Sequence, residues 1–242
     1  MFNLTSVKYV YSSAAPLGAE TVQKLKDQYP RWDIGQGYVC TTSQVDVNFG
    51  SSGSLVPLAR AKIIDLDTGA EITKYDCPGE LLVQSPTVSL GYLSNDDANE
   101  ETFVSSHDGR WVRTGDKALF RTAPSGHEHM FVVGRIKELI KVKGYQVAPA
   151  ELEALILTHK AISDCAVVGV PHEEAGEVPM AYVVRSVGCD EITSETIVSE
   201  ILQLIKETKP RHKWIRGGIT FVHEIPRNSR GKILRQQLGR DV

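Results

Sequence analysis

The sequence lacks the features of several common protein classes. Its 242 residues include only four cysteines, and none forms a C-x-x-C pair, so neither a zinc knuckle nor a disulfide framework is indicated. No run approaches the ~18 apolar residues of a membrane span. Twenty-seven basic residues against 30 acidic ones give a net charge of −3. Proteins that coat nucleic acid carry a strong basic excess, so we expect no nucleic-acid partner.

Targeting signals are also missing. Residues 1–5 show neither the charged n-region nor the apolar h-region of a signal peptide. The last three residues, Arg240-Asp241-Val242, do not match the S-K-L peroxisomal signal. Widely spaced cysteines favour a reducing compartment. We therefore expect a cytoplasmic protein, with a peroxisomal protein that lacks the usual signal as the alternative.

The chain begins with half of a βαβ unit. Residues 6–11 are rich in β-branched and aromatic residues and predict a strand, which a small-residue turn at 12–18 follows. Val22 and Leu25 have helical spacing, and Pro30 ends that helix. This half unit has no sheet to join. We expect either a partner chain that supplies the missing N-terminal region or a larger protein of which this is a piece.

From about residue 55 the pattern changes to short strands separated by turn signals. Strands are predicted at residues 61–66, 79–84, 111–112 and 131–133. This spacing predicts a small antiparallel sheet or a distorted β-barrel. Between these strands, Ser94 is expected to cap a short acidic helix that extends to Glu101.

After Gly134 the pattern is that of a compact α+β domain. Pro149 occupies the first position of a predicted helix, and a second, amphipathic helix is predicted over about residues 194–208. Strands are predicted at 166–170, 181–184 and 219–222, and a last helix from Lys232. We therefore divide the chain into residues 1–134, made of a βα segment (1–54) and a barrel-like subdomain (55–134), and an α+β domain (135–242).

Five motifs follow one another in a fixed order. They are Gln36-Gly37-Tyr38, Gly79-Glu80-Leu81 with Gly91-Tyr92, Trp111 to Asp116, Gly134 to Glu153, and Pro226 to Arg235. Together they resemble the adenylate-forming enzymes, which include acyl-CoA and aryl-CoA synthetases, firefly luciferase and peptide-synthetase adenylation domains. The run from Lys143 to Glu151 is most similar to the 4-coumarate–CoA ligase and luciferase branch. The resemblance implies the tail of a large α/β N-terminal domain followed by an α+β C-terminal domain.

The resemblance also implies a reaction. Such enzymes join a small-molecule carboxylic acid to the α-phosphate of ATP, release pyrophosphate, and pass the acyl group to CoA. Both reacting groups are anionic, so catalysis needs cations and positioning. By resemblance, Lys232 is the adenylation lysine and Lys141 acts in thioester formation. The alternatives are a solvated lysine at a helix start for Lys232 and the wet face of a strand for Lys141.

Further residues match cofactor positions of the family. Asp116 and Arg135 resemble the pair that binds the ribose hydroxyls of AMP, a task suited to the two oxygens of a carboxylate. A turn cap and a surface salt bridge are their structural alternatives. Lys137 matches the hinge between half-reactions. The other matches are Ala14 and Ala15 beside adenine, Gln36, Gly37, Tyr38 and Thr41 in the following loop, and Lys143, Gly144 and Gln146 at CoA.

The sequence departs from the family at its anion and cation sites. Thr42 stands where the family has a glutamate for Mg²⁺, and a hydroxyl is a poor ligand for that hard cation. The Ser/Thr/Gly-rich loop that cradles pyrophosphate in the family is not found, and Gly50 to Ser54 lacks the lysine and helix that should follow it. We therefore expect impaired activity. The rival hypotheses are a non-catalytic remnant that binds AMP weakly or acts through a partner, and a luciferase-like or peptide-synthetase-type adenylation.

Two other features have a structural interpretation. His127 and His129 lie one residue apart, but a metal site needs three or four ligands, so we predict a hairpin and no metal site there. Residues 209–216 combine basic side chains with Trp214. A solvated loop is expected there, with binding of RNA or CoA phosphates as the alternative.

Overall fold

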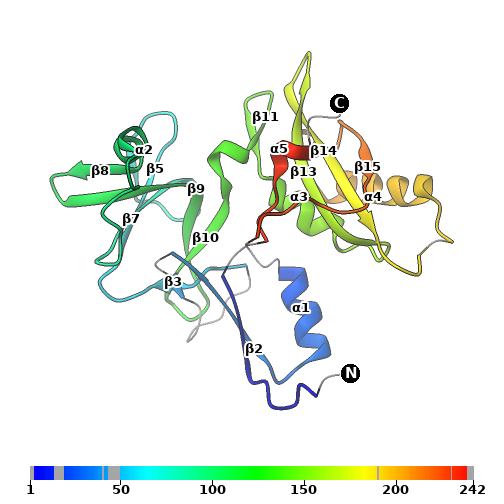
Figure 1. Ribbon diagram of the computed structural model, residues 1–242, viewed down its shortest axis with the longest axis horizontal. Coiled ribbons are helices and arrows are strands. Elements are labelled where there is room, and N and C mark those ends of the chain that lie inside the picture. The colour runs from blue at the N-terminus through cyan, green and yellow to red at the C-terminus, as the bar shows by residue number, and fades with distance from the viewer. Residues whose placement is uncertain are drawn as a thin grey trace. The chain divides into compact units, whose positions relative to one another are not determined.

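The computed structural model describes residues 3–13, 19–39, 41–42, 50–189, 191–229 and 231–238. The chain divides into two compact units, residues 1–136 (unit 1) and residues 137–242 (unit 2) (Figure 1). Within the described ranges, no helix has both the length and the apolar character needed to cross a membrane.

Unit 1 begins with a four-stranded sheet in the order β1-β2-β3-β4. Strand β1 (Tyr9–Ser12) pairs in parallel with β2 (Asp33–Tyr38), and helix α1 (Ala19–Gln28) lies between them in sequence. Strands β3 (Thr41–Thr42) and β4 (Ser54–Leu55) extend the sheet in the antiparallel sense. The predicted strand and helix are therefore present, although the strand begins three residues later than expected. Residues 14–18 of the predicted turn lie outside the described residues.

The second sheet of unit 1 is antiparallel and has six strands in the order β10-β9-β7-β5-β6, with β8 also paired to β9. Its elements are β5 (Arg60–Ile64), β6 (Glu71–Ile72), β7 (Gly79–Gln84), α2 (Asp96–Thr102), β8 (Phe103–Ser106), β9 (Gly109–Thr122) and β10 (Glu128–Arg135). The cap of α2 is Asn95, whose Oδ1 accepts a hydrogen bond from the Ala98 N–H, so the prediction of Ser94 was one residue early.

This sheet is open, so of the two predicted forms the antiparallel sheet is confirmed and the barrel was wrong. Closure requires the edge strands β6 and β10 to pair with each other, and the described strands do not do so. Instead, residues 51–53 hydrogen-bond to the edge of β10. The N–H of Ser52 donates to the Met130 carbonyl at 2.8 Å, and the N–H of Met130 donates to the Gly53 carbonyl at 2.9 Å. This edge of β10 is thus occupied by residues 51–53.

The core of unit 1 lies on one face of the six-stranded sheet. Its buried members are Ile63, Leu81, Val83, Ala118 and Met130. The half-buried Tyr38 and Leu55 of the first sheet pack against the same cluster. Burial of the Tyr38 ring therefore brings the end of β2 onto the second sheet.

Unit 2 has a five-stranded sheet in the order β12-β11-β14-β13, with β15 paired in parallel to β14. Its elements are β11 (Ile140–Val142), β12 (Tyr145–Val147), α3 (Pro149–Ile156), β13 (Ile162–His172), β14 (Gly176–Arg185), α4 (Ser194–Thr208), η2 (Arg211–Lys213), β15 (Ile219–Phe221) and α5 (Arg235–Leu238). The predicted start of α3 and both ends of α4 are confirmed. The last helix begins at Arg235, three residues after the predicted start.

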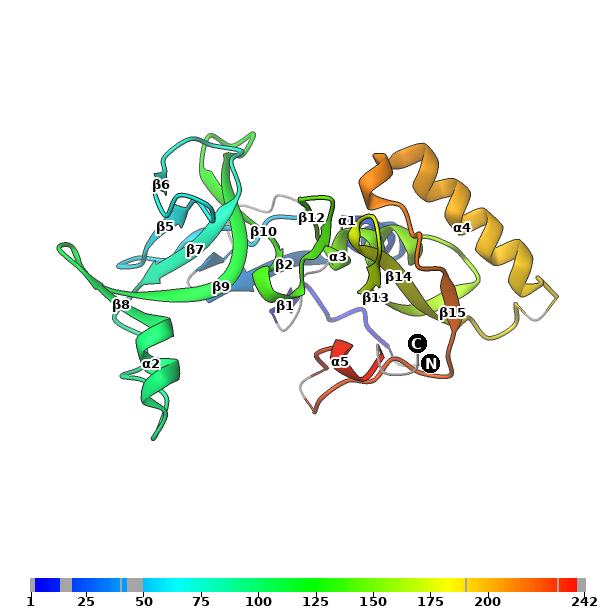
Figure 2. The same ribbon diagram turned by 90° about the horizontal axis from the view of Figure 1, so that it is seen from above.

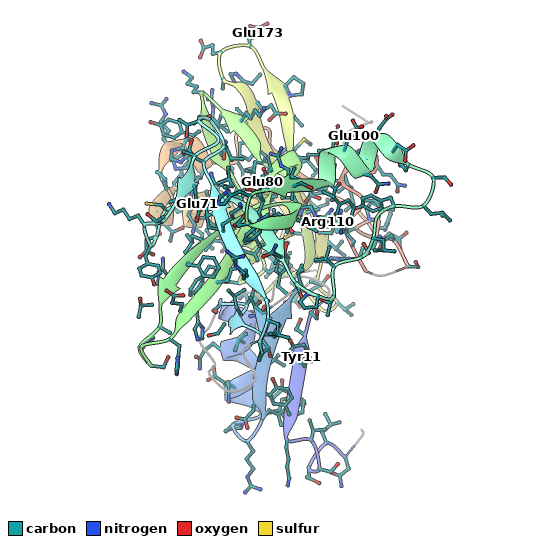
Figure 3. All side chains as sticks on the ribbon, turned by 90° about the vertical axis from the view of Figure 1, so that its left-hand side faces the viewer. Tyr11, Glu71, Glu80, Glu100, Arg110 and Glu173 are labelled. Atoms are coloured by element: carbon teal, nitrogen blue, oxygen red, sulfur yellow. The ribbon has the colours of Figure 1, made fainter. Side chains whose placement is uncertain are left out.

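Both faces of this sheet are covered. On one face, Ile197, Ile201 and Ile205 of α4 recur every four residues and are fully buried in one cluster with Leu152 and Ile156 of α3. On the other face, Leu238 of α5 packs with Met180 and other sheet residues. Figure 2 shows α4 and α5 on opposite sides of β13 and β14. The hairpin of these two strands ends in an acidic tip at Glu173 (Figure 3).

Candidate functional site

The backbone around Asp116 is fixed by a local irregularity in β9. Gly115 has a φ of +68°, a left-handed conformation that favours glycine. The pairing of β7 with β9 shifts register at this point. The Asp116 N–H donates to the Thr114 hydroxyl at 3.1 Å, and that hydroxyl donates to the Leu81 carbonyl at 2.9 Å. Asp116 is only 8% exposed as a result.

The structure brings Asp116 together with Arg135 and Tyr38. Arg135 lies directly opposite on β10, with its Nε 3.6 Å from Oδ1 of Asp116. The Tyr38 hydroxyl donates a hydrogen bond to Oδ2. The Arg135 side chain is 54% exposed, so these three side chains, which we call the Asp116 group, place a guanidinium at the surface of unit 1 beside a nearly buried carboxylate. Such a pair can accept from and donate to the hydroxyls of a sugar.

The β2–β3 hairpin carries the other predicted nucleotide residues of unit 1. The Thr41 hydroxyl donates to the Tyr38 carbonyl at 3.0 Å, which ties the hairpin to the Asp116 group. Gln36 and Gly37 precede Tyr38 on β2. A Cβ on Gly37 would lie 1.5 Å from the Tyr11 hydroxyl, so this position has no room for a side chain unless Tyr11 moves. Ala14 and Ala15 lie outside the described residues.

The predicted adenylation lysine belongs to a segment of unit 2 that we call the lysine loop, made of the described residues 226–229 and 231–235. The Lys232 N–H donates to Asn228 Oδ1 at 2.9 Å, and its Nζ lies 3.6 Å from Oε1 of Glu138. Because α5 begins only at Arg235, Lys232 does not occupy the expected helix start. Its side chain is 44% exposed.

An ion-pair network at the base of this loop was missed by the sequence analysis. Arg235 donates through Nε to Glu138 at 3.0 Å and through NH1 and NH2 to both oxygens of Glu153. Burial, the largest single influence, acts to lower the pKa of Arg235, but the attraction of the Glu153 and Glu138 carboxylates raises it overall. Arg235, Glu138 and Glu153 all lie within the motifs that carry the family resemblance. Their place in those motifs was the signal that could have marked them as functional residues.

The residues matched to CoA lie on one β-hairpin of unit 2. Lys143 and Gly144 form its two-residue turn with φ values of +48° and +83°, as a type I′ turn requires. Lys141 of β11 lies directly opposite Gln146 of β12, and both are exposed. The arrangement brings these four residues together, on the solvent side of the hairpin.

Lys137, the predicted hinge residue, is the first residue of unit 2. It lies in the middle of a short 3₁₀ helix, η1 (Ile136–Glu138), that directly follows β10. Its neighbours Arg135 and Glu138 therefore belong to different groups, the first to the Asp116 group and the second to the Arg235 network.

The described residues offer no built site for Mg²⁺. Thr42 pairs with Gly37 and Ser54 in the first sheet and contributes only a neutral hydroxyl. In the described part of the chain, no three histidine, cysteine, aspartate or glutamate side chains gather as metal ligands would. The donor set at Thr42 therefore does not fit a hard divalent cation.

The two structural predictions have different outcomes. The hairpin at His127 and His129 is confirmed: β9 pairs with β10, and the fully buried His129 lies 2.9 Å from the Ser51 hydroxyl. The solvated loop at 209–216 was wrong in part. Lys209 and Lys213 both pair with Glu151 of α3, at 2.8 and 2.6 Å, which fixes the loop against that helix.

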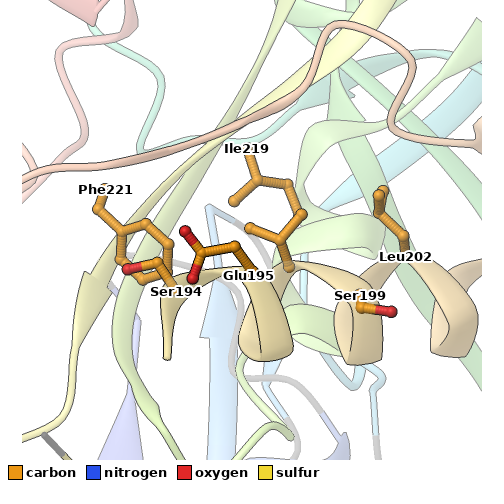
Figure 4. A pocket seen from close by; sticks show the side chains of 7 residues that line it. Ser194, Glu195, Ser199, Leu202, Ile219 and Phe221 are labelled. Atoms are coloured by element: carbon orange, nitrogen blue, oxygen red, sulfur yellow. The ribbon is translucent and has the colours of Figure 1, made fainter. Parts of the chain in front are cut away.

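Unit 2 also carries an open apolar groove of about 480 Å³ between α4 and β15 (Figure 4). Val198 and Leu202 of α4 face Ile219 and Phe221 of β15, and Glu195 lies among them. None of the predicted site residues lines this groove.

Two models of known protein families match this chain. The family model of the AMP-binding enzyme matches residues 2–93, and that of the AMP-binding enzyme C-terminal domain matches residues 151–232. The chain belongs to the AMP-binding enzyme family. This is the adenylate-forming family that the five motifs resemble.

Named relatives of this AMP-binding chain include CoA ligases. The chain is 42% identical to acyl-CoA ligase AKT1 of Alternaria alternata over 98% of its own length and 42% of the relative. It is 41% identical to 4-coumarate–CoA ligase-like 2 of Arabidopsis thaliana, again over 98% of its own length and 41% of the relative. The chain thus spans less than half of these relatives. They match it as part of one longer chain, which gives no support to a separate partner chain.

The solved structures show the same fold. The anthranilate CoA ligase AuaEII in complex with anthranoyl-AMP aligns with a TM-score of 0.83 and 29% identity, over 98% of this chain and 45% of that one. ATP-bound MatB from Rhodopseudomonas palustris aligns with a TM-score of 0.78 and 26% identity, over 94% and 44%. The α/β architecture of this AMP-binding chain is therefore that of adenylate-forming enzymes.

Proposed function

We propose that this chain carries the ribose-binding and lysine-bearing parts of an acyl-CoA or aryl-CoA ligase of the 4-coumarate–CoA ligase type. The intact reaction converts ATP, a carboxylic acid and CoA into acyl-CoA, AMP and pyrophosphate. The observation that carries the proposal is the Asp116 group, in which a carboxylate, a guanidinium and a phenol meet from three strands. About 40% identity to acyl-CoA and 4-coumarate–CoA-like ligases supports it.

In this proposal Asp116 holds the ribose of ATP and AMP. Its two oxygens accept from the two vicinal hydroxyls, while Arg135 donates to the sugar or the α-phosphate. Asp116 is nearly buried, so its hydrogen bonds face little competition from water. Tyr38 and the backbone of Thr114 to Asp116 orient the carboxylate before the nucleotide arrives. Because the carboxylate is already oriented, it can accept from the ribose hydroxyls without being reordered when the nucleotide binds.

Lys232 supplies the positive charge for adenylation. The attacking carboxylate and the α-phosphate repel each other, and an ammonium on a long, flexible side chain can stabilise the charge that develops between them. Lys232 suits this role because its backbone is held by Asn228 while its side chain is 44% exposed. Lys137 is the hinge between the half-reactions, and the exposed hairpin with Lys141, Lys143, Gly144 and Gln146 serves thioester formation with CoA.

AMP binding tests the ribose assignment. Isothermal titration calorimetry measures AMP binding to the wild-type chain and to Asp116→Ala. The variant is expected to bind AMP roughly 10- to 100-fold more weakly, because a hydrogen bond to a charged group is worth about 1.5–3 kcal/mol. The matched control is Asp76→Ala, which breaks an exposed pair with Arg121 in the same unit and should leave AMP affinity unchanged. Equal affinity of Asp116→Ala and wild type would exclude the assignment.

Pyrophosphate release tests the catalytic assignment. The assay uses ATP, CoA and a panel of cinnamates and fatty acids, with wild type and Lys232→Ala. Loss of release in Lys232→Ala supports the proposal, whereas full release in that variant contradicts the role of Lys232.

A non-catalytic AMP-binding protein is the second candidate function. The observation that favours it is Thr42, which presents a hydroxyl where the family presents a carboxylate. AMP binding that depends on Asp116, together with no pyrophosphate release from any acid of the panel, would select this candidate over the ligase.

A further inference from the structure

Glu138, the residue after the proposed hinge Lys137, shares its carboxylate between two cations of the lysine loop. Its Oε2 accepts from Nε of Arg235 at 3.0 Å. Its Oε1 lies 3.6 Å from Nζ of Lys232. The segment that begins unit 2 is thereby connected to the loop near the other end of the chain.

The two cations are held to very different degrees. The Arg235 side chain is 18% exposed, and its guanidinium also donates to both oxygens of Glu153 and to the Val167 carbonyl. The Lys232 side chain is 44% exposed, and Glu138 is the carboxylate that lies beside its ammonium. Arg235 therefore fixes Glu138 in place, whereas Lys232 is free to exchange this carboxylate for another anion.

The backbone of the lysine loop is also anchored. Arg227 bonds both oxygens of Asp164 at 2.8 and 3.0 Å and donates to the Gly231 carbonyl at 2.9 Å. Asn228 bonds the backbone of Lys232 through its side-chain oxygen and its own N–H, both at 2.9 Å. Movement of the Lys232 ammonium thus requires only rotation of its side chain.

We propose that Glu138 is a positioning residue for Lys232. With no polyphosphate bound, its carboxylate retains the Lys232 ammonium beside the segment that follows Lys137, and it yields the ammonium to a polyphosphate. A partly exposed ion pair is weak, and a polyphosphate carries several negative charges, so the exchange favours the ligand. The inference rests on the proposed function for the identity of that ligand, ATP.

The retention is tested by lysine-selective ¹⁵N NMR of the ammonium groups in the 242-residue chain, with the Lys232 signal assigned from Lys232→Arg. Hydrogen exchange of the Lys232 ammonium with water is expected to be about two- to fivefold faster in Glu138→Gln than in wild type. Glu151→Gln is the matched control. It removes the carboxylate of Lys209 and Lys213 and should speed their exchange while that of Lys232 stays unchanged.

Equal exchange of Lys232 in wild type and Glu138→Gln overturns the inference. A general loosening of unit 2 would speed Lys209 and Lys213 in Glu138→Gln as well, and that outcome also overturns it. If Glu138→Gln fails to fold, the same exchange rate is measured in wild type while NaCl is raised from about 0.05 to about 0.5 M. Salt at this concentration screens exposed ion pairs. Faster exchange of Lys232 beside an unchanged Arg235 Nε–H signal supports the inference, and no response of Lys232 overturns it.

The release is tested with inorganic tripolyphosphate and separately with ATP. Tripolyphosphate is expected to make the Lys232 exchange rates of wild type and Glu138→Gln equal. If it leaves their difference intact, the release is refuted. If tripolyphosphate abolishes the difference and ATP does not, the inference stands and the proposed function fails.

Discussion

The two units of this chain bury their apolar surface in different ways. Unit 2 covers both faces of its sheet, with Ile201 of α4 fully buried on one face and Leu238 of α5 on the other. In unit 1, the parallel pair β1–β2 leaves Tyr9 and Tyr11 37% and 47% exposed, and Figure 3 shows Tyr11 on this pair. Parallel strands are normally buried on both faces. Unit 2 thus contains its own core, whereas we expect the first sheet of unit 1 not to be stable by itself.

The largest expected effect is a difference in autonomous folding. A fragment of residues 137–242 is expected to fold and to unfold cooperatively in urea, because its two core clusters lie wholly within it. A fragment of residues 1–54 is expected to stay unfolded. Far-UV circular dichroism and urea titration measure both. A disordered 137–242 fragment, or a folded 1–54 fragment, would remove the contrast between the units.

Buried ion pairs provide the next test. Arg235→Met is expected to lower the free energy of unfolding by about 3–5 kcal/mol, since it leaves the Glu153 carboxylate buried without its cation. Arg113→Met in unit 1 is the counterpart, because Arg113 pairs with the buried Glu80. Arg113 is 49% exposed, so water can replace it and the loss should be smaller. Chemical denaturation measures both variants.

The double variant Arg235→Met/Glu153→Gln provides the control. Neutralising Glu153 should restore part of the stability that Arg235→Met loses. No restoration would show that the effect comes from packing rather than from charge.

Two glycines, one in each sheet of unit 1, differ in what an added side chain would meet. A Cβ on Gly79 of β7 would lie 2.4 Å from the Ile64 carbonyl oxygen, which is backbone and cannot yield easily. Gly79→Ala should therefore cost about 1–3 kcal/mol. A Cβ on Gly35 of β2 would instead meet the tip of the exposed Tyr9 ring, which can rotate away. Thermal unfolding should show a smaller shift for Gly35→Ala, and equal shifts would contradict this account.

The smallest expected effect concerns pH. Burial, the largest influence, raises the pKa of Glu151, but the Lys209 and Lys213 ammonium groups lower it below its ordinary value of 4.5 overall. A lowered folded-state pKa stabilises the protein above the unfolded pKa, and this contribution is lost as pH falls through the folded value. Glu151 is partly exposed, so the contribution is about 1 kcal/mol or less. Urea midpoints of wild type and Glu151→Gln should differ at pH 7 and converge as the pH falls through the lowered folded-state pKa of Glu151.

Local features of the fold were predictable from the sequence. Helix α4 begins and ends as expected because Ile197, Ile201 and Ile205 recur at helical spacing and Pro210 cannot continue the helix. Pro149 marks the start of α3 for a similar local reason. These signals depend on residues within a few positions of one another.

Features that depend on distant residues were not predictable. The six-stranded sheet stays open because residues 51–53 reach the edge of β10, a pairing across more than 70 positions that no local pattern announces. The Tyr38–Asp116 hydrogen bond joins residues 78 positions apart. Each of the two residues could be matched to a family motif by itself. The hydrogen bond between them could not be predicted from their spacing in the sequence.

The sequence by itself determined the family, the α/β and α+β elements and the types of side chain available for binding, because these depend on local patterns and ordered motifs. Only the tertiary structure decided which of those side chains share hydrogen bonds. Arg235 is 97 positions from Glu138 and 82 from Glu153, and their pairing exists because the folding of the sheet brings those segments together. The type of each residue determines its side-chain chemistry, whereas the chain topology determines which charged groups become partners.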